Sequence, residues 1–218
     1  MKINSEKSTF SKLFDVSRET LKKLIQYELK IISFNEKSNI IGKSTIPHIW
    51  KRHFADSAKI LSFITTIVKK NENRKLTICD VGSGAGFPGL VLSIAAKERN
   101  IPLKIKLIEK SKRKINFLKE IITKLKLNAN AIYQDVEDEK FHFVDDTFVA
   151  RAFKPLPKIF ELIHNKAKNF KKIIIFLGKN GQDGLLQASK NWDIKYKQTM
   201  SVTNSDSVII EINKLIKK

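Results

Sequence analysis

The chain has 218 residues, of which 42% are hydrophobic and 14 are Phe, which is typical of a globular domain with a full core and not of a disordered chain. It contains no run of about 18 apolar residues, and its N-terminal segment lacks the apolar core of a secretion signal, so we expect a cytoplasmic protein with no membrane span. The formal net charge of +20 favours a polyanionic partner such as nucleic acid over a lysine-rich surface that binds nothing.

The first part of the chain has the apolar periodicity of helices. Apolar side chains recur at helical spacing over residues 8–34, and Ser17 is placed to cap a helix that restarts there. A polar connector follows over residues 35–47. Residues 46–70 are predicted as a second helical block, with Pro47 in its first turn.

From Lys75 onwards, strand and helix patterns alternate, which predicts βαβ units around a mostly parallel, seven-stranded sheet. Strands are predicted over residues 76–81, 103–108, 130–133, 146–150, 172–177, 193–201 and 207–213, and helices over residues 88–98, 111–126, 155–168 and 183–190. The last two strands are joined by too few residues for a parallel crossover, so they form an antiparallel hairpin. We therefore predict an α/β fold with a helical cap (residues 1–70) and a Rossmann-like domain (residues 71–218).

A glycine-rich turn follows the first predicted strand. The strand ends at Asp80, and Gly82, Gly84, Gly86 and Gly89 come within the next nine residues, just before a helix. Bare backbone at these glycines lets a ligand approach closely, and the free N–H groups of the helix start favour an anionic group. In an α/β sheet, ligands bind outside the carboxyl ends of the strands, so this turn is the predicted ligand site.

The turn matches the dinucleotide pattern G-x-G-x-x-G, but a single match is weak evidence. Asp80 would repel a pyrophosphate and attract an ammonium group, and the closing hairpin is foreign to a plain dinucleotide fold. Both features favour S-adenosylmethionine as the cofactor, with its carboxylate near the glycines and its ammonium near Asp80.

Three further groups lie at the same predicted edge. Glu109 ends the second strand, where an acidic group accepts both ribose hydroxyls; alternatively, it only opens the next helix. The acidic segment Asp135–Asp138 could read the adenine edge, or be an ordinary turn. Arg151, at the end of the fourth strand, could hold the cofactor carboxylate or a substrate phosphate, or form a surface salt bridge.

No acid–base or metal constellation competes with this interpretation. The four histidines lack metal-ligand spacing, the single Cys79 excludes a thiolate metal site, and no G-x-S-x-G motif occurs. We therefore expect no metal and no catalytic residue in the strict sense. Guanine N7 fits such a site, because it has a free lone pair, carries no proton and could be methylated by positioning alone.

Several segments resemble the RsmG (GidB) family of bacterial small-subunit ribosomal RNA guanine-N7 methyltransferases. The resembling segments, in family order, are Asn35–Ile41, Arg52–Ser57 (Arg-His-x-x-Asp-Ser), Asp80–Leu90, Leu107–Arg113, Arg151–Phe153 and Leu177–Lys179. The resemblance implies a class I Rossmann-like methyltransferase fold and activity on 16S ribosomal RNA. It also implies cofactor contacts at Gly82, Phe87, Val136, Glu137 and Arg151. The chain departs from the family pattern at Ile41, Ala150 and the order Gly178-Lys179.

The resulting hypothesis is a monomeric rRNA (guanine-N7)-methyltransferase whose partner is ribosomal RNA or the small subunit. Asp80, Gly84 and Glu109 complete the predicted cofactor site. The predicted substrate-binding residues, which would contact the RNA backbone, are Arg52, His53 and Lys179. One alternative is an NAD-type oxidoreductase, for which a catalytic group is missing and Asp80 fits badly. The other is a non-catalytic RNA-binding factor with a degenerate cofactor site.

Overall fold

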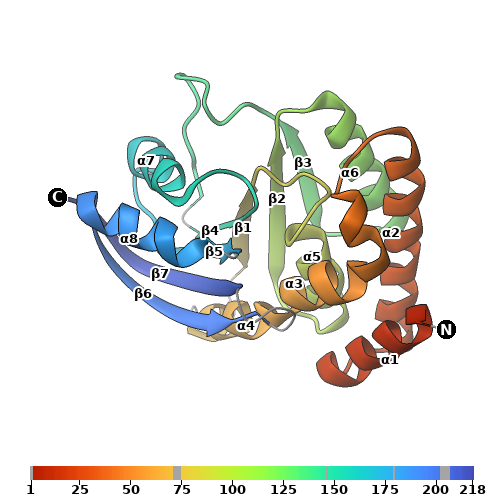
Figure 1. Cartoon of the computed structure of the whole chain (residues 1–218). Helices are drawn as coiled ribbons and strands as arrows, with labels where there is room; N and C mark the ends of the chain where they lie inside the picture. Colours follow the sequence, from red (N-terminus) through yellow and green to blue (C-terminus); the bar gives the residue numbers. More distant parts are fainter. Residues whose placement is uncertain (1, 71–74, 146, 179, 202–206) are drawn as a thin grey trace.

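The computed structural model describes residues 2–70, 75–145, 147–178, 180–201 and 207–218. Its centre is a seven-stranded sheet in the order β3-β2-β1-β4-β5-β7-β6 (Figure 1). The strands are β1 (Leu76–Val81), β2 (Leu103–Glu109), β3 (Ala129–Tyr133), β4 (Thr147–Arg151), β5 (Lys172–Leu177), β6 (Trp192–Met200) and β7 (Val208–Lys217). Strands β1 to β5 are parallel, and β7 runs antiparallel to both β5 and β6. The predicted α/β fold and its closing hairpin are confirmed.

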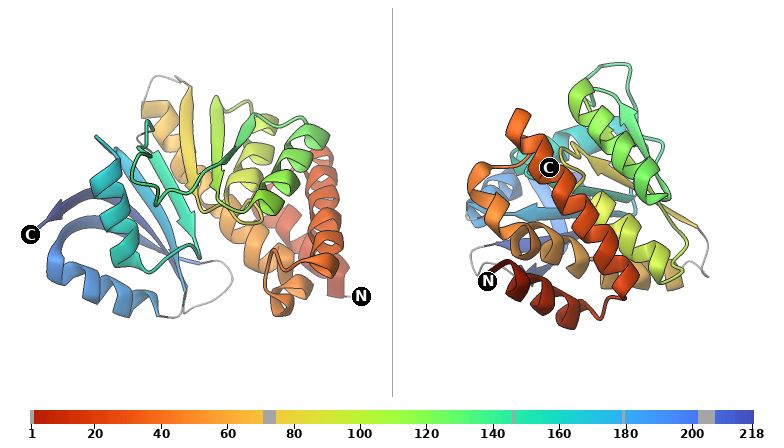
Figure 2. Two further views of the ribbon diagram at one scale, coloured as in Figure 1. Left: turned by 90° about the horizontal axis from the view of Figure 1, so that it is seen from above. Right: turned by 90° about the vertical axis from the view of Figure 1, so that its right-hand side faces the viewer.

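Helices cover both faces of the sheet. They are α1 (Lys2–Phe14), α2 (Arg18–Lys37), α3 (Asp56–Lys59), α4 (Leu61–Lys70), α5 (Gly89–Glu98), α6 (Lys112–Leu125), α7 (Leu156–Lys166) and α8 (Gly181–Asn191). One hydrophobic cluster joins the N-terminal helices to α5, α6 and one face of the sheet, and a second joins α7 and α8 to the other face. Figure 2 shows the N-terminal helices on one side of the molecule and α7 and α8 on the other.

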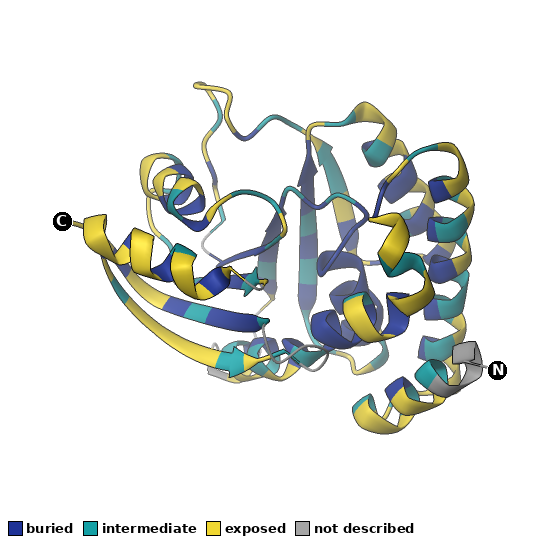
Figure 3. Cartoon of the chain, viewed as in Figure 1, coloured by how far each residue is buried: buried dark blue, intermediate teal, exposed yellow. Residues whose placement is uncertain are grey.

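The burial of the strands follows from this layering. Strands β1 and β2 lie between helices and are mostly buried, whereas β6 is an edge strand and is exposed along most of its length (Figure 3). Because the N-terminal helices share one hydrophobic cluster with α5 and α6, they are packed onto the Rossmann-like part. The division of the chain near residue 70 stays a prediction. Within the described residues, no helix is both long and apolar enough to cross a membrane.

The predicted break in the first helical segment is confirmed. Helix α2 begins directly after Ser17, whose hydroxyl accepts a hydrogen bond from the Thr20 N–H at 3.1 Å. This is the geometry of an N-cap, which satisfies one of the free N–H groups at a helix start. At its other end α2 runs on to Lys37, into the stretch predicted as a connector.

The second helical block is not one helix. Residues Lys43–His48 form a 3-10 helix (η1) that contains Pro47, and Trp50–Ala55 form a π-helical turn (η2) that leads into α3 and α4. The Ser57 hydroxyl donates to the carbonyl oxygen of His53 at 2.6 Å, in the wide turn. Single π-helical turns are frequent at functional sites. The apolar periodicity predicted a helix here but could not distinguish its three forms.

Candidate cofactor site

The strand order reverses at β1, which lies between β2 and β4, and a ligand crevice is expected at such a point. A pocket of about 240 Å³ opens there, at the carboxyl ends of β1 to β4. Its lining consists of Gly82, Ile108, Glu109, Lys110, Lys114, Gln134, Asp135, Val136, Glu137, Ala152, Phe153 and Lys154. Drug-sized ligands occupy pockets of roughly 300–1,000 Å³, so this pocket fits the nucleoside part of a cofactor. The remainder would extend along the glycine turn.

Position 82 requires glycine for two reasons: its backbone conformation, and the lack of room for a side chain. Its φ is +69°, in the left-handed region, and a Cβ placed there would lie 2.0 Å from the ring of Phe153. Phe153 therefore packs directly on the glycine turn and forms one wall of the pocket. The approach of an aromatic wall to bare backbone explains why the first glycine of the motif cannot carry a side chain.

Asp80 holds the start of α5. Its Oδ2 accepts a hydrogen bond from the Gly89 N–H at 2.8 Å, and the residue is fully buried. Burial raises the pKa of Asp80 to about 7, the bond from Gly89 lowers it, and the nearby Glu109 raises it. Oδ1 has no hydrogen-bond partner among the described residues. Asp80 is not part of the pocket lining, and its contact with a cofactor ammonium stays a prediction.

Glu109 connects the glycine turn to the next helix. Its Oε2 accepts from the Gly84 N–H at 3.0 Å, and its Oε1 accepts from the Ser111 N–H at 2.8 Å. The side chain therefore opens helix α6 and lines the pocket at the same time. Each carboxylate oxygen accepts more than one hydrogen bond, so capacity for a ribose hydroxyl remains. Gly84, although predicted as a cofactor contact, serves here as a donor to Glu109.

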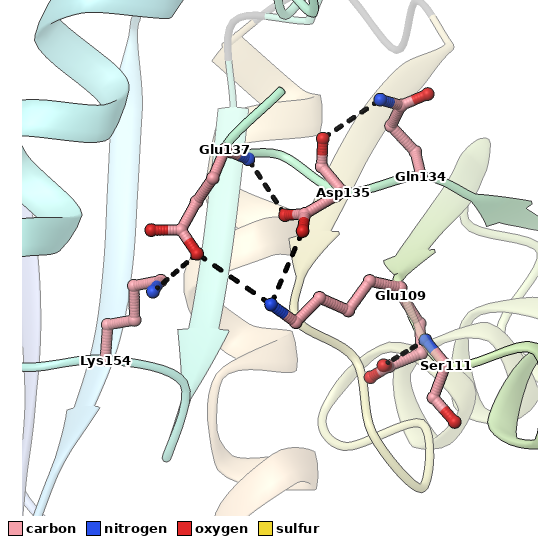
Figure 4. A network of polar contacts seen from close by, with 7 residues as sticks. Glu109, Ser111, Gln134, Asp135, Glu137 and Lys154 are labelled. Carbon is pink, nitrogen blue, oxygen red and sulfur yellow. Dashed lines mark hydrogen bonds and ion pairs between the residues drawn. The ribbon is translucent and has the colours of Figure 1, made fainter. Parts of the chain in front are cut away.

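A network of charged side chains closes one side of the pocket (Figure 4). Lys110 Nζ lies 3.4 Å from Asp135 Oδ2 and 3.8 Å from Glu137 Oε2, and Lys154 Nζ lies 3.0 Å from the same oxygen of Glu137. The Glu137 N–H donates to Asp135 Oδ1 at 3.0 Å, and this bond is the main reason that the pKa of Asp135 is lowered. Val136 lies buried between the two acidic residues. The two lysines carried no signal in the sequence.

Phe87 belongs to the core. It is buried, and its ring lies 5.5 Å from that of Tyr27 and 5.8 Å from that of Phe54, both from the N-terminal helices. Tyr27 is itself fully buried, and its hydroxyl donates to the carbonyl oxygen of Ala85 in the glycine turn. The helical cap therefore packs against the glycine turn and forms a hydrogen bond to its backbone. A cofactor contact at Phe87, implied by the resemblance, would have to use its backbone.

Replacing Tyr27 with Phe removes only the bond to Ala85, and we expect two effects. The unfolding free energy falls by about 1–3 kcal/mol, because the Ala85 carbonyl loses its buried partner. Affinity for the cofactor product S-adenosylhomocysteine falls a few-fold, because the turn loses its support. Urea unfolding and calorimetry measure the two effects. Tyr133→Phe, at an exposed tyrosine, is the matched control, and equal behaviour of the two variants would contradict the assignment.

Arg151 is tied to the helical cap. Its Nη2 donates to the carbonyl oxygen of Arg52 and lies 3.6 Å from Asp56 Oδ2. Its guanidinium carbon lies 5.4 Å from the ring centre of Phe176. Burial lowers the pKa of Arg151, and Asp56 opposes this shift. Arg151 therefore forms an ion pair, but with the buried Asp56 and not at the surface as the alternative expected. Its Nη1 is buried without a hydrogen-bond partner among the described residues. Leaving such a donor unsatisfied costs about 1–3 kcal/mol, and an acceptor on a bound ligand would remove that cost.

His53 lies beside this cluster as a neutral imidazole. Its ring stacks on Phe87 with 4.7 Å between ring centres, and burial, Arg151 and Arg52 together lower the pKa of His53 to about 3. Its Nε2 lies 3.1 Å from Thr45 Oγ1, whose one proton is donated to the Gly42 carbonyl. Nε2 must therefore carry the imidazole proton, and Nδ1 is a bare acceptor.

The predicted RNA contacts thus differ in character. Because His53 is neutral near pH 7, it offers a phosphate no positive charge, whereas Arg52 is exposed and cationic. Lys179 lies outside the described residues. Asp56 was missed as a site residue, although it is the acidic member of the Arg-His-x-x-Asp-Ser motif.

Comparison with known proteins places this geometry in a family. Residues 20–212 match the sequence model of the GidB family, described as rRNA small subunit methyltransferase G. The chain belongs to this family. Membership confirms the predicted methyltransferase activity and the cofactor S-adenosylmethionine, and it makes ribosomal RNA the substrate class.

Relatives that carry the family's name cover nearly the whole chain. The Ribosomal RNA small subunit methyltransferase G of Pelagibacter ubique is 39% identical over 210 residues, which are 94% of this chain and 93% of the relative. That of Bartonella tribocorum is 34% identical, covering 91% and 89%. The MTase domain of METTL16 is similar in structure, with a TM-score of 0.54 at 11% identity, over 74% of this chain and 68% of that domain. At this identity the likeness shows the fold alone.

Proposed function

We propose that this GidB-family protein transfers the methyl group of S-adenosylmethionine to N7 of a guanine in small-subunit ribosomal RNA. The observation that carries the proposal is the pocket at the carboxyl ends of β1 to β4. The predicted residues Gly82, Glu109, Val136 and Glu137 all line it. The excess of basic over acidic residues, which gives a formal net charge of +20, supports a polyanionic substrate.

The residues of the site fit the cofactor. Glu109 has acceptor capacity for the ribose, and buried Val136 supplies an apolar wall for the adenine beside Glu137. The glycine turn leads from this pocket towards the start of α5, and Arg151 at the end of β4 would hold the carboxylate. When bound, S-adenosylmethionine supplies an electrophilic methyl group on a sulfonium.

Guanine N7 is the proposed acceptor because the site fits catalysis by positioning. The carboxylate of Glu109 accepts two backbone N–H groups, and that of Glu137 is paired with Lys154. The third carboxylate of the lining, Asp135, accepts the Glu137 N–H and is paired with Lys110. No carboxylate of the described pocket lining is therefore poised as a general base. N7 needs none, since it attacks through its own lone pair, and the protein has only to align the two reactants. The resemblance to the RsmG family supports the same atom.

The direct test supplies labelled S-adenosylmethionine and small ribosomal subunits that lack the modification. We expect label in the small-subunit RNA, recovered as 7-methylguanine after digestion and mass analysis. Label in another base or another atom of guanine would refute the acceptor. Absence of label from the RNA would contradict the proposed reaction.

Arg52 is the proposed phosphate contact. Replacing it with Ala should weaken RNA binding several-fold at moderate salt and lower the slope of log affinity against log salt by about 1, because one counterion fewer is released. Arg18→Ala, at an exposed position at the start of α2, removes the same charge away from the site. Titrations at several salt concentrations measure both variants. A slope that changes equally in both would show a general charge effect and contradict the contact.

We also propose that the enzyme acts as a monomer in the cytoplasm, where ribosomal RNA is assembled into subunits. Sedimentation of the purified protein at working concentration tests the monomer, and a stable dimer would contradict it.

A further inference from the structure

Asp56 occupies a position that the cofactor site does not yet explain. It begins α3, directly after the π-helical turn η2, and its side chain is only 7% exposed. Its Oδ2 faces Arg151 Nη2 at 3.6 Å, and its Oδ1 accepts a hydrogen bond from Ser201 Oγ at 2.6 Å. One carboxylate thus connects the helical cap, the end of β4 and the segment after β6.

We propose that Asp56 is the positioning residue that fixes the Arg151 guanidinium for the carboxylate of the cofactor. The inference rests on the proposed function, because it gives Arg151 the cofactor as its ligand. Asp56 itself touches neither the cofactor nor the RNA. It acts through Arg151, together with the Arg52 carbonyl and the ring of Phe176.

The arrangement of the guanidinium supports this role. A guanidinium is planar and rigid, so contacts at one nitrogen determine where the other points. Nη2 donates to the carbonyl of Arg52 and is paired with Asp56, and the guanidinium carbon lies over the ring of Phe176. Nη1 remains without a partner among the described residues. A buried donor without a partner is uncommon in proteins, and an acceptor on a bound ligand would satisfy this one.

The position of Arg151 in the fold indicates which group of the cofactor it binds. It ends β4, which pairs with β1 through Asp80 and Val149, so Arg151 lies at the sheet edge where the glycine turn begins. Two residues further on, Phe153 packs on Gly82. The carboxylate of the methionine part is the oxyanion of the cofactor, and a charge-assisted bond from an arginine is its natural partner.

The test compares two ligands that differ in the carboxylate alone: S-adenosylmethionine and its decarboxylated form, which keeps the ammonium. In Asp56→Asn we expect affinity for S-adenosylmethionine to fall about tenfold, because a charged contact is misplaced. Affinity for the decarboxylated form should stay within about twofold of wild type. In turnover, KM for the cofactor should rise while KM for RNA and kcat change little.

Controls separate positioning from a structural role. Asp145→Asn removes another little-exposed carboxylate, paired with Lys106 at 2.8 Å, and should leave both affinities unchanged. Asp56→Glu, which keeps the charge, should recover part of the lost affinity. If Asp56→Asn folds poorly, Ser201→Ala tests the same carboxylate, because it removes the hydrogen bond from Ser201 to Asp56. This variant should lose less affinity for S-adenosylmethionine and, again, almost none for the decarboxylated form.

The outcomes are distinct. Equal loss for both ligands, or no loss in Asp56→Asn and Ser201→Ala, overturns the positioning role and leaves the proposed function standing. Failure of the wild-type protein to bind either ligand overturns the proposed function and the inference with it.

Discussion

Replacing Gly82 with Ala should nearly abolish cofactor binding while the helical cap stays folded. The added Cβ would lie 2.0 Å from the Phe153 ring, and the φ of +69° is strained for any residue with a side chain. The strain of a left-handed backbone costs about 1–2 kcal/mol, and overpacking against the ring costs about 1–3 kcal/mol more. Because Phe153 and Gly82 both line the pocket, the turn and the wall must shift together.

Calorimetry with S-adenosylhomocysteine measures this effect, and we expect a loss of more than about tenfold. Gly178→Ala is the matched control, because a Cβ there meets nothing within 4 Å and its φ is not positive. The double variant Gly82→Ala, Phe153→Ala tests the cause: removal of the ring relieves the overlap but not the backbone strain, so the unfolding free energy lost in Gly82→Ala should be partly restored. Normal affinity in Gly82→Ala would contradict the described turn.

Replacing Asp80 with Asn should change how stability depends on pH. The pKa of Asp80 rises on folding from its ordinary value of 3.8 to about 7, mainly through burial. Between these two values the folded protein binds the proton that the unfolded chain releases, so stability falls as pH rises. Ionisation of the buried Asp80 lowers the unfolding free energy by about 4 kcal/mol above pH 7, and this loss is absent below about pH 4.

Urea unfolding at about pH 5 and about pH 8 measures the prediction. Relative to wild type, Asp80→Asn should gain stability on going from the lower to the higher pH. Asp193→Asn is the control, because the exposed pair with Lys214 lowers the pKa of Asp193 from its ordinary value of 3.8. Asp193 is then ionised in both the folded and the unfolded chain at both pH values, so the stability difference between this variant and wild type should not change. If the unfolding free energies of wild type and Asp80→Asn change equally with pH over this range, the buried carboxyl ionises normally, which would contradict the prediction.

The sheet could be predicted from sequence because its signals are local. Apolar runs bounded by glycines and charges marked β1 and β5 to the residue, and the short last connection required an antiparallel hairpin. The N-cap at Ser17 was also readable, since capping depends on the next three residues alone. The same holds for the glycine turn, whose position after a strand identified the edge that binds the ligand.

The features that were missed depend on contacts distant in sequence. The helical block over residues 46–70 contains different helical forms, and its π-helical turn contacts β4 through Arg52 and the glycine turn through His53. The apolar periodicity of the sequence does not record such contacts. The sequence predicted His53 as an RNA backbone contact. In the structure, burial and Arg151, which is almost a hundred residues away in the chain, keep its imidazole neutral. Asp56 and Lys154 have roles only through partners on other elements.

The central claim concerns one atom of one RNA, and a map of that RNA tests it most directly. Small-subunit ribosomal RNA would be analysed by mass mapping from a strain that lacks this protein, and from the same strain carrying the wild type, Gly82→Ala or Gly178→Ala. We predict that one guanine loses its N7 methyl group in the deletion strain, regains it with wild type and Gly178→Ala, and stays unmodified with Gly82→Ala. An unchanged pattern of guanine-N7 methylation in the deletion strain would contradict the account.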